Sequence, residues 1–305
     1  MIMEIPTQAT EAQFNQNNYS EVLTAFTRDW KDNEGLEALL NFIAPKVPVA
    51  RRFEYKQTPA DQIFCSEIDD ERAGGSGFKH IRFSGDAVQA KTLNKGLTIR
   101  IDADDIVGED WQIRYVHLLM KRLFRNELRR AIKALKENAK VIEKAWNDES
   151  QPDVDVRQIL LNMTKENGFA PNRLLFGELA WYLRQDCYAL QDNAGARISS
   201  EMTREGLAEK LLVEDVKLLK KQNLGLQGNE ITGNEIFAFY AQNGLLKDEP
   251  SNIKRFVTPN NDGGLFRVYM EEHTKFVDIT VEHYSNIVVT SEAHIAQINV
   301  KPKEA

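Results

Sequence analysis

The segment SEIDDERAGGSGFKHIRFSGDAVQAKTL, residues 66–93, decides the fold. Its centre, AGGSG at 73–77, has the composition of a phosphate-binding loop. Such a loop must open a helix, because the backbone amides and the helix dipole together bind the phosphate. Gly77 is instead followed by Phe78, Lys79 and a pattern of period two, which is typical of a strand. The glycines therefore indicate the tip of a hairpin.

Both flanks of this tip have the alternation of extended chain. Apolar residues alternate with polar ones at Phe53, Tyr55, Ile81, Phe83, Leu97, Ile99 and Ile101. The returning limb 78–101 spans up to about 75 Å when fully extended, whereas a compact chain of this size has a radius of gyration of about 19 Å. We therefore expect the hairpin to project beyond its own subunit. An isolated hairpin is marginally stable in water and its free edges invite pairing, so it should lie on a neighbour.

The residues expected to meet that neighbour are charged or glycine. They are Asp70, Glu71, Arg72, Gly74, Gly75, Gly77 and Lys79. Their flexible backbone and exposed charges would let one hairpin adapt to slightly different positions of adjacent subunits.

A long helix is predicted over 109–146, a stretch without Pro or Gly. Its apolar stripe consists of Phe124, Leu128, Ala131, Leu135, Ala139, Ile142 and Trp146. Unbroken, it would reach roughly 50 Å, with Asp104 or Asp105 as its cap. Its cations outnumber its acids, and we interpret them as a solvated face in preference to a strip that faces a polyanion. These cations are Arg114, Lys121, Arg122, Arg125, Arg129, Arg130, Lys133, Lys136, Lys140 and Lys144.

The remaining chain predicts an α+β protein with one compact unit near 150–265. Residues 1–30 are rich in Gln, Asn and Thr and indicate an arm that needs a surface to lie on. A short helix is expected at 36–43, ended by Pro45. Further helices are expected at 156–166, 178–185 and 206–212, and strands at 173–176, 216–220, 236–241, 266–271, 276–281 and 287–300.

Composition bounds the class of protein. With 42% apolar residues, the 305-residue chain can bury a real core, and its net charge of −7 gives no general attraction to nucleic acid or anionic lipid. Cys65 and Cys187 stand alone, which favours a reducing compartment and apolar fillers over a disulfide. No signal peptide or apolar run of membrane-spanning length is present in the sequence, so we expect a soluble protein made in the cytosol.

Motifs for catalysis or metal binding do not emerge. The run DADDIVGED at 102–110 resembles a calcium loop, but Ile106 and Val107 stand where a ligand and a glycine are required. The histidines His80, His117, His273, His283 and His294 are scattered, without ligand spacing. We therefore predict no catalytic, cofactor or metal site; the expectation that the protein is no enzyme comes from the resemblance given next.

The order of parts resembles the major capsid protein of tailed bacteriophages, the Hong Kong ninety-seven type fold shared with encapsulins. FAPNRLLFGELAWYLRQ at 169–185 resembles the phage-head strand that ends in glycine and opens a Trp-bearing helix. FRVYMEEHTKFVDITVEHYSNIVVTSEAHIAQINV at 266–300 is similar to its closing strands. The resemblance implies an N-terminal arm at 1–50, an extended hairpin or E-loop at 51–102, a peripheral domain with a spine helix at 103–150 and 266–305, and an axial domain at 151–265.

This resemblance implies a structural shell protein. It would self-assemble into hexamers and pentamers of an icosahedral virion capsid around double-stranded DNA, bound without sequence specificity, in the host bacterial cytoplasm. Expected partners are further copies, a portal protein and a decoration protein, with no membrane and no cofactor. Because the sequence starts at Met1 with only a short arm before the hairpin, a scaffolding protein would be separate or absent. Some relatives crosslink a hairpin lysine to an asparagine; Lys79, Lys91 and Lys95 lie in this region, but no asparagine can be matched, so no crosslink is predicted.

Two alternatives stay open. An encapsulin-type compartment would use the same fold to enclose enzyme cargo, and neighbouring portal and terminase genes would distinguish a phage from it. Alternatively, 150–265 is an enzyme domain on an oligomerisation stalk, which substrate turnover by a small oligomer would indicate.

Overall fold

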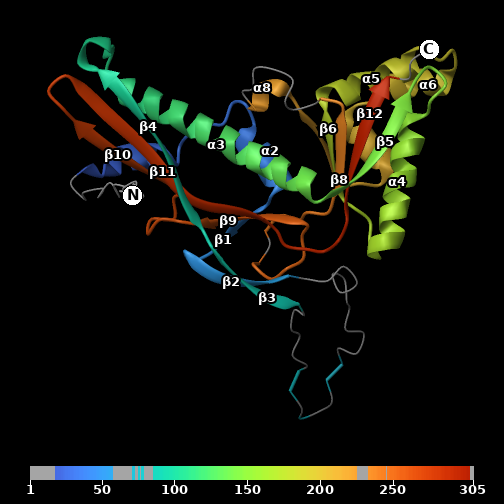
Figure 1. The fold of residues 1–305 in the computed structure, drawn as a ribbon, viewed down its shortest axis with the longest axis horizontal. Coiled ribbons are helices and arrows are strands. Elements are labelled where there is room, and N and C mark those ends of the chain that lie inside the picture. The colour runs from blue at the N-terminus through green and yellow to red at the C-terminus, as the bar shows by residue number, and fades with distance from the viewer. Residues whose placement is uncertain are drawn as a thin grey trace, which may run out of the picture.

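The computed structural model describes residues 18–57, 71–72, 75, 77–78, 85–224, 233–244 and 246–302. Helices and strands are mixed along this part of the chain, which confirms the predicted α+β class. Figure 1 shows two bodies side by side: a long helix lying along an extended sheet, and a second sheet flanked by shorter helices.

The extended sheet is organised around the long strand β11 (Phe276–Val289). Along one edge β11 pairs antiparallel with β4 (Leu93–Asp102). Along the other edge it pairs antiparallel with β10 (Phe266–Glu272) and then with β9 (Ile253–Thr258). The short strand β1 (Lys46–Pro48) adds to β9 in parallel. One continuous strand therefore holds the whole sheet together.

Helix α3 (Trp111–Glu137) packs on this sheet through one apolar face. Its buried apolar residues recur three and four apart, as a core-facing helix requires. They are Val116, Leu119, Met120, Leu123, Phe124, Leu128, Ala131, Ile132 and Leu135. At 1.5 Å per residue the helix is about 40 Å long.

The prediction of one helix over 109–146 is wrong at its C-terminal end. The helix stops at Glu137, where the Asn138 side chain donates a hydrogen bond of 2.8 Å to the Ala134 carbonyl. Residues Ala139–Trp146 form strand β5, which pairs in parallel with β12 (Ile295–Pro302). Pairing with a strand so distant in sequence overrides the helical spacing, which carries no information about a remote partner.

The predicted cap of α3 is also wrong. The Asp102 side chain accepts from the Asp104 amide at 3.1 Å and begins a separate 3-10 helix, Ala103–Asp105. Helix α3 begins after Asp110, whose side chain makes no capping hydrogen bond. Gly108, with φ +82°, lets the chain turn between the two helices.

Within the described residues, the second sheet has the strand order β5-β12-β8-β6-β7. Its inner strands are β8 (Glu235–Phe239) and β6 (Arg173–Gly177), with β7 (Asp215–Leu219) at one edge. Strands β5 and β12 at the other side lie outside the range 151–265 expected for the axial domain. The division of the chain into named domains therefore stays a prediction.

Helices α4 (Pro152–Asn167), α5 (Glu178–Ala189), α6 (Ala194–Ser200) and α7 (Arg204–Leu211) flank this sheet. A proline at its start and a left-handed glycine, Gly168, at its end bound α4, as such residues do. The C-cap of α7 is Leu212, a non-glycine residue at φ +57° with 89% of its surface exposed. A single turn, α8 (Lys221–Leu224), follows β7.

The inner strands β6 and β8 of the second sheet are buried on both faces. Leu174 and Phe176 of β6 belong to the core under α4, α5 and α7, which also holds the free thiol of Cys187 as an apolar filler. Leu175 between them, and Phe237 of β8, belong instead to the core shared with α3. The two bodies therefore share one sheet. Cys65 lies outside the described residues.

Over its described part, the N-terminal arm is not a loose extension, because it folds onto the rest of its own subunit. Helix α1 (Glu21–Phe26) lies on β10, where the Ser20 amide donates to the Val268 carbonyl at 3.0 Å. Helix α2 (Leu36–Ile43), at its predicted position, buries Leu36, Leu40 and Ile43 in the core with α3. The surface that residues 18–50 lie on is thus their own subunit. Residues 1–17 lie outside the described part.

The hairpin is also shorter at its base than predicted. Strands β2 (Arg52–Gln57) and β3 (Asp86–Lys91) pair antiparallel as its two limbs. The next strand, β4, belongs to the extended sheet, so residues 93–102 of the expected hairpin 51–102 do not project. Burial of Ile101 on the sheet explains the difference. Ile81 and Phe83 lie outside the described residues.

Candidate inter-subunit surface

Four of the seven predicted tip residues are described, and all four are exposed: Glu71, Arg72, Gly75 and Gly77. Gly75 adopts φ +85° and a Cβ built there meets nothing within 4 Å, so the backbone angle rather than close packing calls for glycine. The Arg72 guanidinium lies 5.2 Å from the ring centre of Phe78, whose side chain is 72% exposed. Asp70, Gly74 and Lys79 lie outside the described residues.

The base of the hairpin rests on an apolar seat. Phe53 and Tyr55 of β2 pack on Phe256 of β9, with ring centres 4.5 Å and 5.4 Å away. Val47 of β1 joins the same small core. Because a two-stranded sheet is marginal alone, this seat is what gives the hairpin base a defined direction.

Polar contacts hold the same base in place. The Lys247 ammonium donates to the Glu54 carbonyl at 2.9 Å, and the Lys56 amide donates to the Asp248 carboxylate at 3.0 Å. On the other limb the Asn286 amide donates to the Lys91 carbonyl at 3.0 Å. The segment between β8 and β9 therefore clamps the hairpin where it leaves the subunit.

A buried ion cluster links the strand after the hairpin to helix α3. The Glu127 carboxylate of α3 accepts from Lys95 of β4 and from Ser285 of β11, both at 2.8 Å, and from Arg130 at 2.7 Å. His283 of β11 lies 3.8 Å away. Three elements thus meet at one carboxylate.

The charges of this cluster shift its pKa values. Burial favours the neutral acid, but the nearby His283 and the charge and hydrogen bond of Lys95 outweigh it, so the pKa of Glu127 lies well below its usual range. Burial lowers the pKa of the Lys95 ammonium. It also lowers the pKa of the His283 imidazole, which is the more completely buried of the two groups. The cluster is thus a charged carboxylate that compensates buried bases, and its role is structural.

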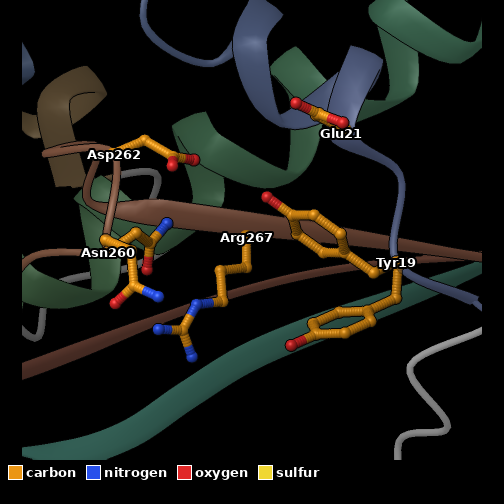
Figure 2. A pocket seen from close by; sticks show the side chains of 7 residues that line it. Tyr19, Glu21, Asn260, Asp262 and Arg267 are labelled. Atoms are coloured by element: carbon orange, nitrogen blue, oxygen red, sulfur yellow. The ribbon is translucent and has the colours of Figure 1, made fainter.

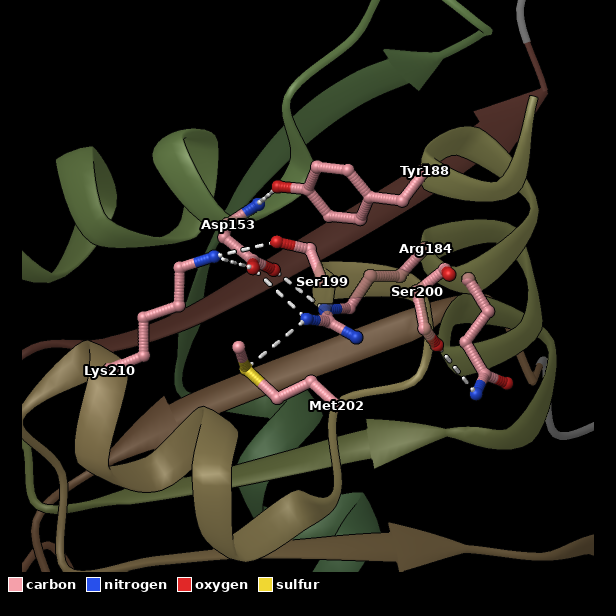
Figure 3. Close-up of polar contacts among 8 residues, drawn as sticks. Asp153, Arg184, Tyr188, Ser199, Ser200, Met202 and Lys210 are labelled. Carbon is pink, nitrogen blue, oxygen red and sulfur yellow. Dashed lines mark hydrogen bonds and ion pairs between the residues drawn. The ribbon is translucent and has the colours of Figure 1, made fainter. Parts of the chain in front are cut away.

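A second buried network fixes the helices of the other body (Figure 3). Asp153 at the start of α4 forms a bidentate pair with Arg184 of α5, at 2.6 Å and 3.0 Å, and accepts from Lys210 of α7 at 2.8 Å. The Tyr188 hydroxyl accepts from the Asp153 amide at 3.1 Å, and burial raises the pKa of Tyr188 to about 12. All of these groups serve to join α4, α5 and α7.

The groove in Figure 2, between the N-terminal segment and the loop after β9, has a volume of about 490 Å³. Its polar groups pair within the chain: the Tyr269 hydroxyl donates to Glu282 at 3.1 Å, and Arg267 lies 3.7 Å from the same carboxylate. It is lined by Tyr19, Glu21, Asn260, Asn261, Asp262, Arg267 and Tyr269. Across the described ranges, no three His, Cys, Asp or Glu side chains gather as metal ligands. In the same ranges, no helix combines the length and apolar character needed to cross a bilayer.

Half of the ten cations predicted on the long helix form ion pairs with acids from elsewhere in the chain. Ion pairs join Lys121 and Arg125 to Glu34, Lys136 to Glu235, Lys140 to Glu166, and Lys144 to Asp155. Neither a uniformly solvated face nor a free polyanion-binding strip describes this arrangement, because the acidic partners come from segments that sequence spacing does not connect.

Sequence reasoning missed two sets of unpaired charges. Arg52 and Lys91, exposed at the hairpin base, form no ion pair with any described residue, and neither do Asp104 and Asp105 before α3. The alternation that predicted β2 already placed Arg52 on the face opposite to the partly buried Phe53. The sequence does not show the strand register, which places Lys91 directly opposite Arg52.

Solved structures with a similar arrangement include phage proteins. The crystal structure of a phage-related protein from Bordetella bronchiseptica RB50 superposes with a TM-score of 0.67 over 92% of this chain and 96% of that one, at 16% identity. A structure from Microbacterium phage Oxtober96 gives 0.52 over 86% and 90%, at 9% identity. The procapsid of satellite phage P4 with its size determination protein gives 0.50 over 93% and 99%, at 10% identity.

These likenesses, together with the projecting hairpin base and the long helix on the extended sheet, define the fold. The chain has the Hong Kong ninety-seven type fold of phage major capsid proteins, which the order of its segments predicted. No protein-family model matches the sequence, and no curated protein matches it.

Proposed function

We propose that this chain is the structural major capsid protein of a tailed bacteriophage. It would assemble into hexamers and pentamers of an icosahedral shell that encloses double-stranded DNA. The observation that carries the proposal is the likeness to the phage-related protein, with a TM-score of 0.67 across nearly the full length of both chains. This support is an analogy of fold, and the exposed hairpin is the site-level observation that adds to it.

The described surface supports assembly through extended contacts. The hairpin base has a fixed direction on Phe256, while the described residues beyond it are exposed. We propose that the tip residues Glu71, Arg72, Gly75 and Gly77, with Asp70, Gly74 and Lys79, lie on the adjacent copy. Each contact would be weak, and closed symmetry would sum many of them into a stable shell.

The charge distribution fits a shell that encloses DNA without binding it tightly. The net charge is −7, and the main cations of α3 are already paired with acids of the same chain. Contact with packaged DNA would then be weak and non-specific. A portal protein, a separate scaffolding protein and a decoration protein complete the proposed set of partners, with assembly in the host bacterial cytoplasm and the virion capsid as the final location.

Expression of the full chain followed by electron microscopy tests the proposal. We expect closed, uniform particles built from hexamers and pentamers; a monodisperse monomer or small oligomer that turns over a substrate would contradict it and favour the enzyme alternative. Nucleic-acid content of particles from infected or lysogenic cells then decides between the two shell functions. Protein cargo in place of DNA would indicate an encapsulin-type compartment.

A further inference from the structure

The outer face of the hairpin base carries two like charges side by side. Arg52 of β2 stands directly opposite Lys91 of β3 in the antiparallel ladder. The neighbouring residue Phe53 packs inward on Phe256, so Arg52 and Lys91 project from the opposite face of the two strands. Like charges in directly opposite positions destabilise a strand pair. Neither side chain forms an ion pair with a described residue, although Glu54 lies on the same face of the hairpin, two residues from Arg52.

The opposite sign gathers at the start of α3. Asp104, Asp105, Glu109 and Asp110 are all exposed and form no ion pair with described residues. Arg114, the cation of the first turn of α3, donates instead to the Val107 carbonyl. The positive end of the helix dipole attracts negative charge at this end of α3.

One subunit cannot bring the two groups together. In Figure 1 residues 103–110, the teal turn at the upper left, lie at one extremity of the molecule, and β2 and β3 lie at the bottom. Two copies can do so, because the hairpin base of one copy is free to meet the helix start of the next. Such a contact is head-to-tail, the kind that repeats around a ring.

We propose that Arg52 and Lys91 of one copy bind the acidic residues Asp104 and Asp105 of a second copy in the assembled shell. This inference rests on the proposed function and assigns the surface that receives the hairpin base. The occupant is argued from charge complementarity: an exposed cationic pair and an exposed acidic group, neither held in an ion pair among the described residues, lie at separate ends of the molecule. Exposed ion pairs are individually weak, so their effect is to set orientation and register between copies, and salt should screen it.

Charge reversal in the full chain tests the proposal. Arg52→Glu with Lys91→Glu should lower the fraction of protein in shells, measured by sedimentation and electron microscopy at low salt, by about tenfold or more. Adding Asp104→Lys and Asp105→Lys to the same chain should restore most of that yield. The matched control, Arg157→Glu with Lys165→Glu, makes the same change of charge on exposed residues of α4 and should assemble as the unmodified protein does.

A second measurement needs no variant. Shells co-assembled from isotopically labelled and unlabelled copies are treated with a zero-length carbodiimide, which joins amine to carboxylate only in direct contact. Mixed-isotope peptides joining Lys91 to Asp104 or Asp105 support the proposal. Shells that form normally but lack that crosslink, or a double reversal that assembles at full yield, would overturn it. If the unmodified chain forms no shells, the proposed function fails first, which separates the two failures.

Discussion

Glu127 is the residue on which the joint between the hairpin strand and the long helix depends. Its carboxylate is the acid that compensates Lys95, itself only 12% exposed in its side chain, and it lies beside His283. Replacing Glu127 with Gln leaves a buried ammonium without its counter-charge. We expect the unassembled protein to lose about 3 kcal/mol of unfolding free energy in urea titrations. Glu137→Gln, which breaks the exposed pair with Lys133, should cost less than about 1 kcal/mol; equal losses would contradict this role.

His283 gives the same joint a pH dependence. Burial lowers the pKa of this imidazole below its value in the unfolded chain, so the unfolded chain binds the proton more readily. Stability is therefore present above the unfolded pKa of about 6.5 and falls as the pH drops through the folded value. Urea midpoints between about pH 7 and pH 5 should decline less steeply for His283→Gln than for the unmodified protein. His294→Gln serves as the control, and an unchanged slope for His283→Gln would reject the assignment.

Gly177 is required by close approach rather than by its backbone angle. A Cβ at this position would lie 2.6 Å from the Gly233 carbonyl carbon, where β6 passes into α5. Gly177→Ala must displace backbone, and we expect a loss of about 1–3 kcal/mol in thermal or urea unfolding. Gly195→Ala in α6 meets only a side-chain oxygen at 3.5 Å and should be neutral or stabilising by about 0.5 kcal/mol. The same cost at both positions would remove the argument for Gly177.

At the scale of elements, local signals predicted what local chemistry decides. The helix at 36–43 has its predicted bounds, and the helix at 156–166 ends at Gly168 as expected. The sequence predicts a helix over β5 because its apolar residues keep a helical spacing. The partner that makes it a strand, β12, lies far away in sequence. Strand β9 was missed because its buried charges, Lys254 and Arg255, obscure the apolar signal. Long-range pairing and internal ion pairs are the two kinds of information that one sequence lacks.

The candidate inter-subunit surface could be predicted from the sequence to the same extent: its local features could be predicted, and its long-range contacts could not. Exposure and the turn at Gly75 follow from glycine and charge in an extended segment, which sequence displays directly. The seat on Phe256 and the opposition of Arg52 to Lys91 follow from register, which depends on the folded sheet. The tip as a contact with neighbours stays a prediction.

Removal of the tip tests the hairpin as an element. Deleting residues 70–77 should abolish shells and leave a folded, soluble monomer, because the anchored base and both sheets lie outside the deletion. Circular dichroism would check folding, and electron microscopy would check assembly. A second variant replaces the same eight positions with Gly and Ser, which keeps the length of the tip. This variant should form shells only if the charges of the tip are dispensable for assembly. Particle yield of the deletion equal to that of the full chain would contradict the role of the tip.

For the whole molecule, the shared sheet predicts a single unfolding transition. Leu175 packs into the core with α3, while Leu174 and Phe176 pack into the core under α4 and α5. Losing either core exposes one face of the same strand, so neither body should melt alone. Calorimetry of the unassembled protein should give a van't Hoff enthalpy close to the calorimetric one. Two resolved peaks would show that the bodies are independent.

The position of β12 between β5 and β8 has a consequence for protein synthesis. Every other strand of that sheet leaves the ribosome before residues 295–302 do, so the gap between β5 and β8 stays open until these residues have emerged. A nascent polypeptide therefore cannot complete the sheet earlier, even when other copies are being made on the same polysome. Emergence of residues 295–302, rather than local concentration, would then time the first encounter between folded molecules.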